Sequence, residues 1–186
     1  MKIGSTTALY FHFLPFQVIQ PPSFFFLFLT TQFTAMDLEY LMFGQEQIES
    51  LIPQRSPMIM VDGLLHSDEK STTSTLKVLS ENIFVGNGCL QEPGIIENMA
   101  QTVALRAGYE AQQHDKKPEV GFIGAVKRLK IERLPKVNEQ LITTIDLINQ
   151  LLGAMVVHAT TRVNGRQIAE ADLSIFLSKP TKTPLD

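Results

Sequence analysis

The 186-residue sequence has a single cysteine, Cys89, and no excess of basic residues. It also lacks the unbroken stretch of about 20 apolar residues that a transmembrane helix needs. One cysteine excludes a disulfide framework and a zinc cluster built on cysteines. The formal net charge of −3 argues against a protein that binds nucleic acid through a basic surface. Because the sequence has no P-loop, Rossmann glycine fingerprint or metal-ligand spacing, we expect neither a cofactor nor a bound metal.

What is present is the composition of an ordinary folded protein. The length is typical of one domain and is sufficient for a hydrophobic core without disulfides or metals. Apolar residues make up 44% and charged residues 19% of the chain, which excludes a disordered, highly charged polypeptide. We therefore expect a cytoplasmic globular protein.

The first 35 residues differ from the rest in composition. Their only charged side chain is Lys2, and they contain eight of the 12 phenylalanines. Pro15, Pro21 and Pro22 divide this stretch into pieces too short to span a membrane, so no stable membrane insertion is expected. From Met36 onward the chain carries 15 basic and 19 acidic residues, a net charge of −4.

Three interpretations of residues 1–35 stay open. Translation starts at Met36 and the upstream stretch is an artefact of start-site assignment, or the stretch is a targeting or membrane-contacting segment, or it is an ordered or disordered extension. A signal peptide fits only roughly, since Lys2 is a short positive region and prolines interrupt the apolar run. We favour the first interpretation, with an extension at 1–35 outside the fold and one domain at 36–186.

Hydrophobic periodicity after Met36 predicts one long helix among several strands. The long helix covers about residues 94–113 and is opened by Pro93. Its apolar stripe consists of Ile96, Met99, Ala100, Val103, Ala104 and Ala107. Asn164-Gly165 predicts a tight hairpin. A short helix is expected at 46–51, a loop at 81–91, and strands at 58–65, 71–79, 120–133, 140–151, 154–163 and 166–177.

A single long helix cannot cover both faces of a sheet this large. The simplest architecture is α+β, with an antiparallel sheet curled around the helix. The remaining face or edge of the sheet then needs a partner, so we expect a homodimer.

Two motifs carry a resemblance to a known family. The first is Pro53-Gln54-Arg55-Ser56-Pro57, followed by four apolar residues and Asp62. The second is Pro93-Gly94 with Glu97-Asn98-Met99-Ala100-Gln101. With the segments at 82–88, 121–127 and 163–171, they make residues 46–178 resemble the hotdog-fold 3-hydroxyacyl-acyl carrier protein dehydratases of FabZ and FabA type, in particular their aryl-polyene branch.

The resemblance implies a hotdog fold, in which an antiparallel sheet wraps one long helix and two protomers pair edge to edge. It implies a 3-hydroxyacyl substrate on acyl carrier protein, dehydrated without a cofactor in a tunnel at the dimer interface. In this family a helix-borne carboxylate, a histidine of the other protomer and a glycine N–H perform the reaction. Carried over by position, Glu97 is the acid and Gly94 the carbonyl donor, while Gln101 and Asn87 position substrate or water.

On the residues alone, these assignments have plain alternatives. Glu97 lies in the expected first turn, where the helix dipole favours its charge, and on the core-facing side, where burial disfavours it. That balance is typical of a general acid, and a capping carboxylate is the alternative. Gly94 either directs an N–H at a carbonyl or serves the turn. Gln101 shares the helix face of Glu97 and can orient it.

Asn87 is the main departure from the family pattern. It occupies the position of the family's histidine, and an asparagine cannot take up a proton at neutral pH. The interval between Pro93-Gly94 and Glu97 is also two residues shorter than in the fuller pattern. The histidines of the chain are more readily explained as structural or solvated residues than as a displaced base: His12, His66, His114 and His158.

Three functions therefore stay open. The first is an active dehydratase, which the retained Glu97 motif favours. The second, favoured by the missing histidine, is an incomplete chain that forms a heterodimer with another hotdog chain or only binds an acyl thioester. The third is a hotdog thioesterase. A basic stretch from Lys127 to Lys136 is either a docking face for acidic carrier protein or, as we prefer, a solvated strand face.

Overall fold

The computed structural model describes residues 41–116, 120–151 and 153–178. The predicted boundary at residue 36 and the interpretations of residues 1–35 therefore lie outside the described residues. The helices in the described part are α1 (Gln45–Leu51) and α2 (Glu92–Gln113). The strands are β1 (Gly63–Ser67), β2 (Ser71–Lys77), β3 (Val85–Gly86), β4 (Cys89–Leu90), β5 (Val120–Ile131), β6 (Gln140–Leu151), β7 (Ala154–Val163) and β8 (Arg166–Ser178).

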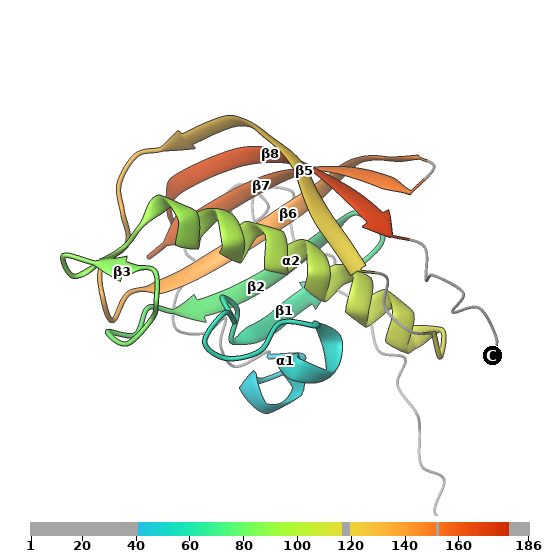
Figure 1. Cartoon of the computed structure of the whole chain (residues 1–186), viewed down its shortest axis with the longest axis horizontal. Coiled ribbons are helices and arrows are strands. Elements are labelled where there is room, and N and C mark those ends of the chain that lie inside the picture. Colours follow the sequence, from blue (N-terminus) through green and yellow to red (C-terminus); the bar gives the residue numbers. More distant parts are fainter. Residues whose placement is uncertain (1–40, 117–119, 152, 179–186) are drawn as a thin grey trace, which may run out of the picture. The chain divides into compact units, whose positions relative to one another are not determined.

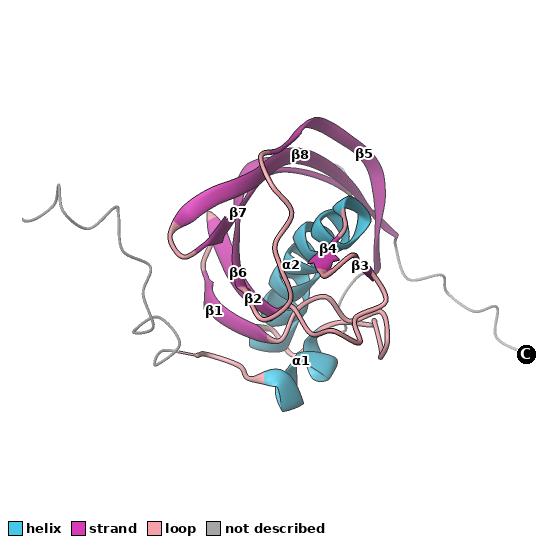
Figure 2. Ribbon diagram, turned by 90° about the vertical axis from the view of Figure 1, so that its left-hand side faces the viewer, coloured by secondary structure: helices cyan, strands magenta, loops and turns pink. Residues whose placement is uncertain are grey.

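Six of the strands form one sheet in the order β1-β2-β6-β7-β8-β5. Every neighbouring pair is antiparallel. Figures 1 and 2 show this sheet curled around α2, which runs along its concave side. The predicted α+β architecture, an antiparallel hotdog sheet around one long helix, is confirmed. Strands β1 and β5 form the two edges of the sheet.

The hairpin between β7 and β8 follows the sequence prediction. Asn164 and Gly165 adopt positive φ angles of 51° and 75°, which a two-residue hairpin turn of this kind requires. The predicted strands at 140–151 and 154–163 coincide with β6 and β7. Local alternation and turn chemistry were sufficient here, because the two strands pair with close sequence neighbours.

The buried face of α2 is more polar than the predicted apolar stripe. Met99 and Val103 are buried as expected, but the three alanines of the stripe are only half-buried. The polar side chains buried on this face are Asn98, Gln101, Thr102 and Arg106.

No helix among the described residues has the length and apolar character that crossing a membrane would require.

Helix α1 packs closely against α2 at Gly108. A Cβ atom at this position would lie 1.9 Å from the carbonyl oxygen of Leu51, so only glycine allows this approach. Ile48 and Leu51 of α1 join Leu105 of α2 in a small second core. The short helix predicted at 46–51 is confirmed, and this contact explains how so short a helix is held.

The predicted strand at 58–65 is wrong in its first half. β1 begins only at Gly63, because backbone groups of Met58 and Met60 bind side chains of α2 instead of a neighbouring strand. Strand pairing begins where Asp62 donates its backbone N–H to the Thr75 carbonyl. The segment before β1 is therefore tied to the helix rather than to the sheet.

A strand with one solvated face alternates between exposed and buried residues, but β2 is buried at five consecutive positions. On one face, Ser74 meets Thr102 of α2 at 2.7 Å. On the other, Thr75 donates a hydrogen bond to the Asp62 carboxylate. Both faces of the strand are covered, which removes the alternation.

A small hairpin lies inside the segment 81–91 that we predicted as a loop. β3 and β4 pair through two residues each, and Asn87 and Gly88 form the turn with φ angles of 52° and 73°. The side-chain amide of Gln91 stabilises the hairpin by donating hydrogen bonds to the carbonyls of Gly86 (2.8 Å) and Cys89 (2.9 Å). The hairpin leads directly into α2.

Candidate functional site

Glu97 lies in the second turn of α2, not the first. The helix begins at Glu92, two residues earlier than predicted, with Gln91 as its N-cap and Pro93 in the first turn. The argument from the helix dipole is therefore wrong for Glu97, because that effect is confined to the first turn. The same shift removes the capping alternative. Glu97 is half-buried, and its Oε1 accepts a hydrogen bond of 2.8 Å from Gln101.

Gln101 is fully buried and makes three hydrogen bonds. Its Oε1 accepts from the Met60 N–H at 2.6 Å, and its Nε2 donates to the Met58 carbonyl at 2.6 Å and to Glu97 Oε1 at 2.8 Å. A backbone N–H only donates and a carbonyl only accepts, so the amide has a single orientation. The structure thus brings Glu97 and Gln101 together, as their spacing of four residues predicted.

Asn98 belongs to the same site, and sequence reasoning missed it. Its Nδ2 donates to the Met60 carbonyl at 2.7 Å, and its Oδ1 accepts from Thr143 Oγ1 at 2.6 Å. The side chain is completely buried. A polar residue next to the core-facing positions of a helix was the available sign, because buried polar atoms need partners.

Gly94 has a packing role in the first turn of α2. Its N–H donates to the Gln91 carbonyl at 2.9 Å. A Cβ atom here would lie 2.6 Å from Leu90 Cδ1 and 2.7 Å from Phe84 Cβ. Close packing of the helix start against the β3–β4 hairpin therefore explains the glycine. The predicted role of its N–H in binding a thioester carbonyl stays a prediction, and that N–H already has an acceptor.

Asn87 lies on the β3–β4 hairpin, whereas Glu97, Gln101 and Gly94 lie on α2. It occupies the first turn position of the β3–β4 hairpin and is exposed to solvent. Asparagine adopts this left-handed conformation more readily than most residues, which gives a structural reason for its presence. Although Asn87, Glu97 and Gln101 are all described, no hydrogen bond joins the first to the other two. Figure 1 shows the hairpin beside the start of α2.

The three described histidines do not contact Glu97. His66 lies 3.0 Å from Asp68, and His158 lies 2.8 Å from Asp172. His114 is the exposed C-cap residue of α2. The fourth histidine lies outside the described residues. Within the described part, no three His, Cys, Asp or Glu side chains gather in a way that would hold a metal ion.

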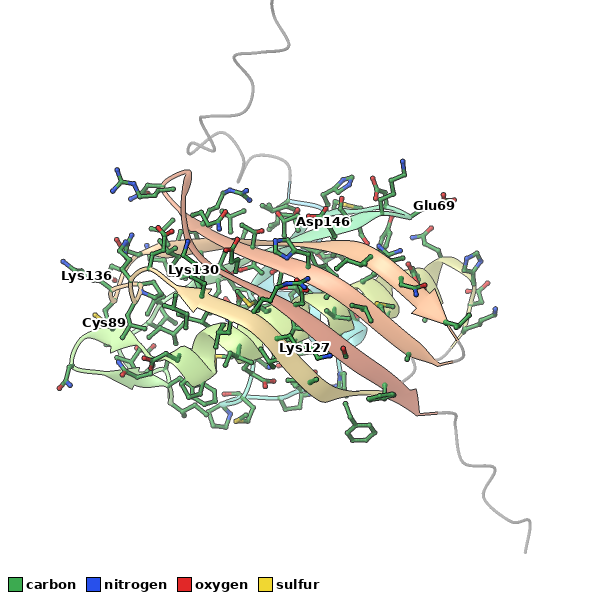
Figure 3. All side chains as sticks on the ribbon, turned by 90° about the horizontal axis from the view of Figure 1, so that it is seen from above. Glu69, Cys89, Lys127, Lys130, Lys136 and Asp146 are labelled. Atoms are coloured by element: carbon green, nitrogen blue, oxygen red, sulfur yellow. The ribbon has the colours of Figure 1, made fainter. Side chains whose placement is uncertain are left out.

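The basic stretch from Lys127 to Lys136 is partly paired with carboxylates. Three of its side chains contact carboxylates: Arg128, Lys130 and Arg133. Arg133 lies 2.7 Å from Glu139 and lowers the pKa of that carboxyl through their hydrogen bond. Figure 3 shows Lys127, Lys130 and Lys136 well separated from one another. These contacts favour the interpretation of a solvated strand face.

A cleft of about 470 Å³ opens beside α1. Its apolar lining includes Ile48 of α1, Ile59, Val61 and Leu76 of β2. None of the four predicted site residues lines it.

Comparison with known proteins finds relatives across most of the chain. The model of the ApeP-like family, described as ApeP dehydratase, matches residues 46–185. A 3-hydroxyacyl-(acyl-carrier-protein) dehydratase FabZ of Burkholderia thailandensis is 28% identical over 157 residues, covering 81% of this chain and 98% of that protein. The FabZ of Burkholderia mallei strain SAVP1 is 28% identical over 155 residues, covering 80% of this chain and all of that protein (100%).

Solved structures share the fold at lower identity. The dehydratase heterocomplex ApeI:P from Xenorhabdus doucetiae matches with a TM-score of 0.68 at 14% identity, covering 73% of this chain and 93% of that chain. A hypothetical thioesterase from Streptococcus pneumoniae matches with a TM-score of 0.51 at 13% identity, covering 62% of this chain and 84% of that chain. At these identities the likeness shows the fold alone.

Proposed function

This chain belongs to the ApeP-like dehydratase family, and from that premise we propose that it acts on 3-hydroxyacyl thioesters carried on acyl carrier protein. The product is a trans-2-enoyl thioester and water. The names of the FabZ relatives support this substrate class. The observation that carries the proposal is the hydrogen bond between Gln101 and Glu97, because it holds a carboxyl group in a defined orientation on the central helix.

Glu97 is the acid of the proposed reaction. A base removes the proton at C2, the electron pair forms the C2=C3 double bond, and the C3–O bond breaks. The departing hydroxyl takes a proton from the Glu97 carboxyl and leaves as water. Proton transfer of this kind contributes about 10²- to 10⁴-fold to a rate. The base gains the C2 proton and Glu97 loses its carboxyl proton, so the elimination needs no further reactant.

The base comes from a second chain. Asn87 stands where the family has histidine, and its amide cannot accept a proton at neutral pH. A histidine-bearing hotdog partner would complete the pair, with this chain supplying Glu97. The solved ApeI:P structure is described as a dehydratase heterocomplex, which supports a heterodimer over a homodimer. The thioesterase alternative has only a likeness of fold in its favour.

The test uses the full chain with a 3-hydroxyacyl-acyl carrier protein. It is assayed alone and with a histidine-bearing hotdog dehydratase whose own acidic residue has been replaced, and enoyl thioester is followed by mass spectrometry. We expect turnover only in the mixture, and loss of that turnover in Glu97→Ala. Glu92→Ala, an exposed glutamate at the start of α2, is the matched control and keeps it.

Absence of enoyl product in every combination would contradict the proposed function. Turnover by this chain alone would contradict the need for a partner. Equal turnover of the native chain and Glu97→Ala would remove Glu97 from the reaction.

A further inference from the structure

A series of fully buried polar side chains leads from the sheet to Glu97. Thr161 of β7, Thr143 of β6 and Asn98 of α2 are each 0% exposed. Thr143 Oγ1 lies 2.9 Å from Thr161 Oγ1 and 2.6 Å from Asn98 Oδ1. Asn98 Nδ2 lies 2.7 Å from the Met60 carbonyl oxygen. The series thus connects two central strands with the segment that Gln101 also binds.

Elementary donor and acceptor chemistry determines the direction of each of these hydrogen bonds. The Met60 carbonyl only accepts, so the Asn98 atom that faces it belongs to the NH₂ group, and the atom that faces Thr143 is the oxygen. That oxygen only accepts, so Thr143 donates its single hydroxyl hydrogen to Asn98. Thr161 must then donate to Thr143.

The direction continues from Met60 to Glu97. The Met60 N–H donates to Gln101 Oε1, which turns the Gln101 NH₂ group toward the carboxyl of Glu97. The side chain of Asn98 binds the carbonyl of Met60, and the side chain of Gln101 binds the N–H of Met60. The orientation of both side-chain amides therefore depends on the backbone of Met60. At every step of the series, the donor is the group farther from Glu97 and the acceptor is the group nearer to it. Hydrogen bonds arranged in series in this way polarise one another.

We infer that Thr161, Thr143 and Asn98 are positioning residues that act through Met60 and Gln101, and that they assign the acid proton of Glu97 to Oε2. Glu97 Oε1 accepts an N–H from an amide that cannot flip, and the unprotonated oxygen of a carboxyl group is the better acceptor of the two, so the proton is favoured on Oε2. Oε2 has no hydrogen-bond partner among the described residues and is free to carry it. The inference rests on the proposed function, in which Glu97 is the acid.

The first readout needs no activity. In the full chain with ¹⁵N-labelled side-chain amides, NMR measures hydrogen exchange of the NH₂ groups of Asn98 and Gln101. Thr143→Val keeps the shape of the side chain and removes the donor to Asn98. We expect exchange of both amides to accelerate about fivefold, the factor that one lost hydrogen bond corresponds to.

Two variants serve as controls. Thr143→Ser keeps the hydroxyl and restores slow exchange. Thr160→Val makes the same change one residue from Thr161, at a buried position outside the series, and leaves both amides unchanged. If Thr143→Val does not fold, Thr161→Val removes the next donor in the series, and acceleration of the same two amides is expected.

The second readout uses the mixed dehydratase assay. Thr143→Val is expected to lower kcat about fivefold with KM within about twofold, because the series orients the acid and does not bind the acyl chain. Unchanged amide exchange in Thr143→Val and Thr161→Val, or equal acceleration in Thr160→Val, would overturn the inference. An effect on KM alone would overturn it as well. Complete lack of dehydration by the native mixture would instead refute the proposed function, while the amide exchange would still decide whether the series holds Gln101.

Discussion

Gln101 Nε2 donates a hydrogen bond of 2.8 Å to Glu97 Oε1, one helical turn away on α2. The same amide is bound to the backbone of Met58 and Met60, so it cannot rotate without breaking two further hydrogen bonds. A half-buried carboxyl is therefore held by a fully buried residue. Because Gln101 serves both the fold and the carboxyl, its replacement has consequences for stability as well as for activity.

Gln101→Leu is expected to destabilise the protein. It leaves the Met60 N–H and the Met58 carbonyl without partners, and an unsatisfied buried polar group costs about 1–3 kcal/mol. We expect the free energy of unfolding in urea to fall by about 2–4 kcal/mol. Gln112→Leu, at an exposed position of the same helix, should change it by less than about 0.5 kcal/mol. Similar losses in the two variants would contradict the account of the Gln101 hydrogen bonds.

Asn87→His is expected to give dehydratase activity to two paired copies of this chain, without a second kind of chain. Histidine tolerates the positive φ of 52° at this position, so the hairpin turn should be retained. A general base contributes about 10²-fold or more, which should raise enoyl formation well above that of the native chain. Asn164→His, at the equivalent position of the β7–β8 turn, is the control. A gain in both variants, or in neither, would show that position 87 is not where the base is missing.

Gly108→Ala is expected to destabilise the contact between α1 and α2. Alanine normally stabilises a helix by about 1 kcal/mol relative to glycine. Here its Cβ would lie 1.9 Å from a backbone oxygen of Leu51, and overpacking of this kind costs about 1–3 kcal/mol. In Gly86→Ala the nearest atom of Gln91 is 3.4 Å away, so a smaller change in unfolding free energy is expected. A stabilised Gly108→Ala protein would contradict the close approach.

Asp68 should make stability depend on pH in acid. The backbone N–H groups of Ser71 and Lys70, and then His66, lower the pKa of the Asp68 carboxyl from 3.8 to about 2. The unfolded chain therefore binds the proton more tightly. The contribution of Asp68 is fully present above about pH 3.8 and is lost as the pH falls through about 2. Asp68→Asn should flatten this part of the urea stability profile, and an unchanged slope would contradict the assignment.

Local patterns predicted most of the elements. β6 and β7 matched their predicted ranges, and the Asn164-Gly165 turn closed the hairpin, because alternation and turn preference act between near neighbours in the chain. The pairing of Glu97 with Gln101 was predictable for the same reason, since residues four apart share one face of a helix. A departure such as Asn87 was visible in the sequence without any knowledge of the fold.

The start of β1, the hydrogen bonds of Asn98 and the place of Asn87 on a hairpin turn were decided only by the tertiary structure. Asn98 meets Met60, 38 positions away, and Thr143, 45 positions away, so neither contact leaves a periodic trace in the sequence. The sequence by itself determined most of the elements, the family and the presence of a carboxyl on the long helix. The packing of α2 against β6 and the segment before β1 decided how that carboxyl is held, because a buried amide takes its orientation from partners that only folding brings within reach.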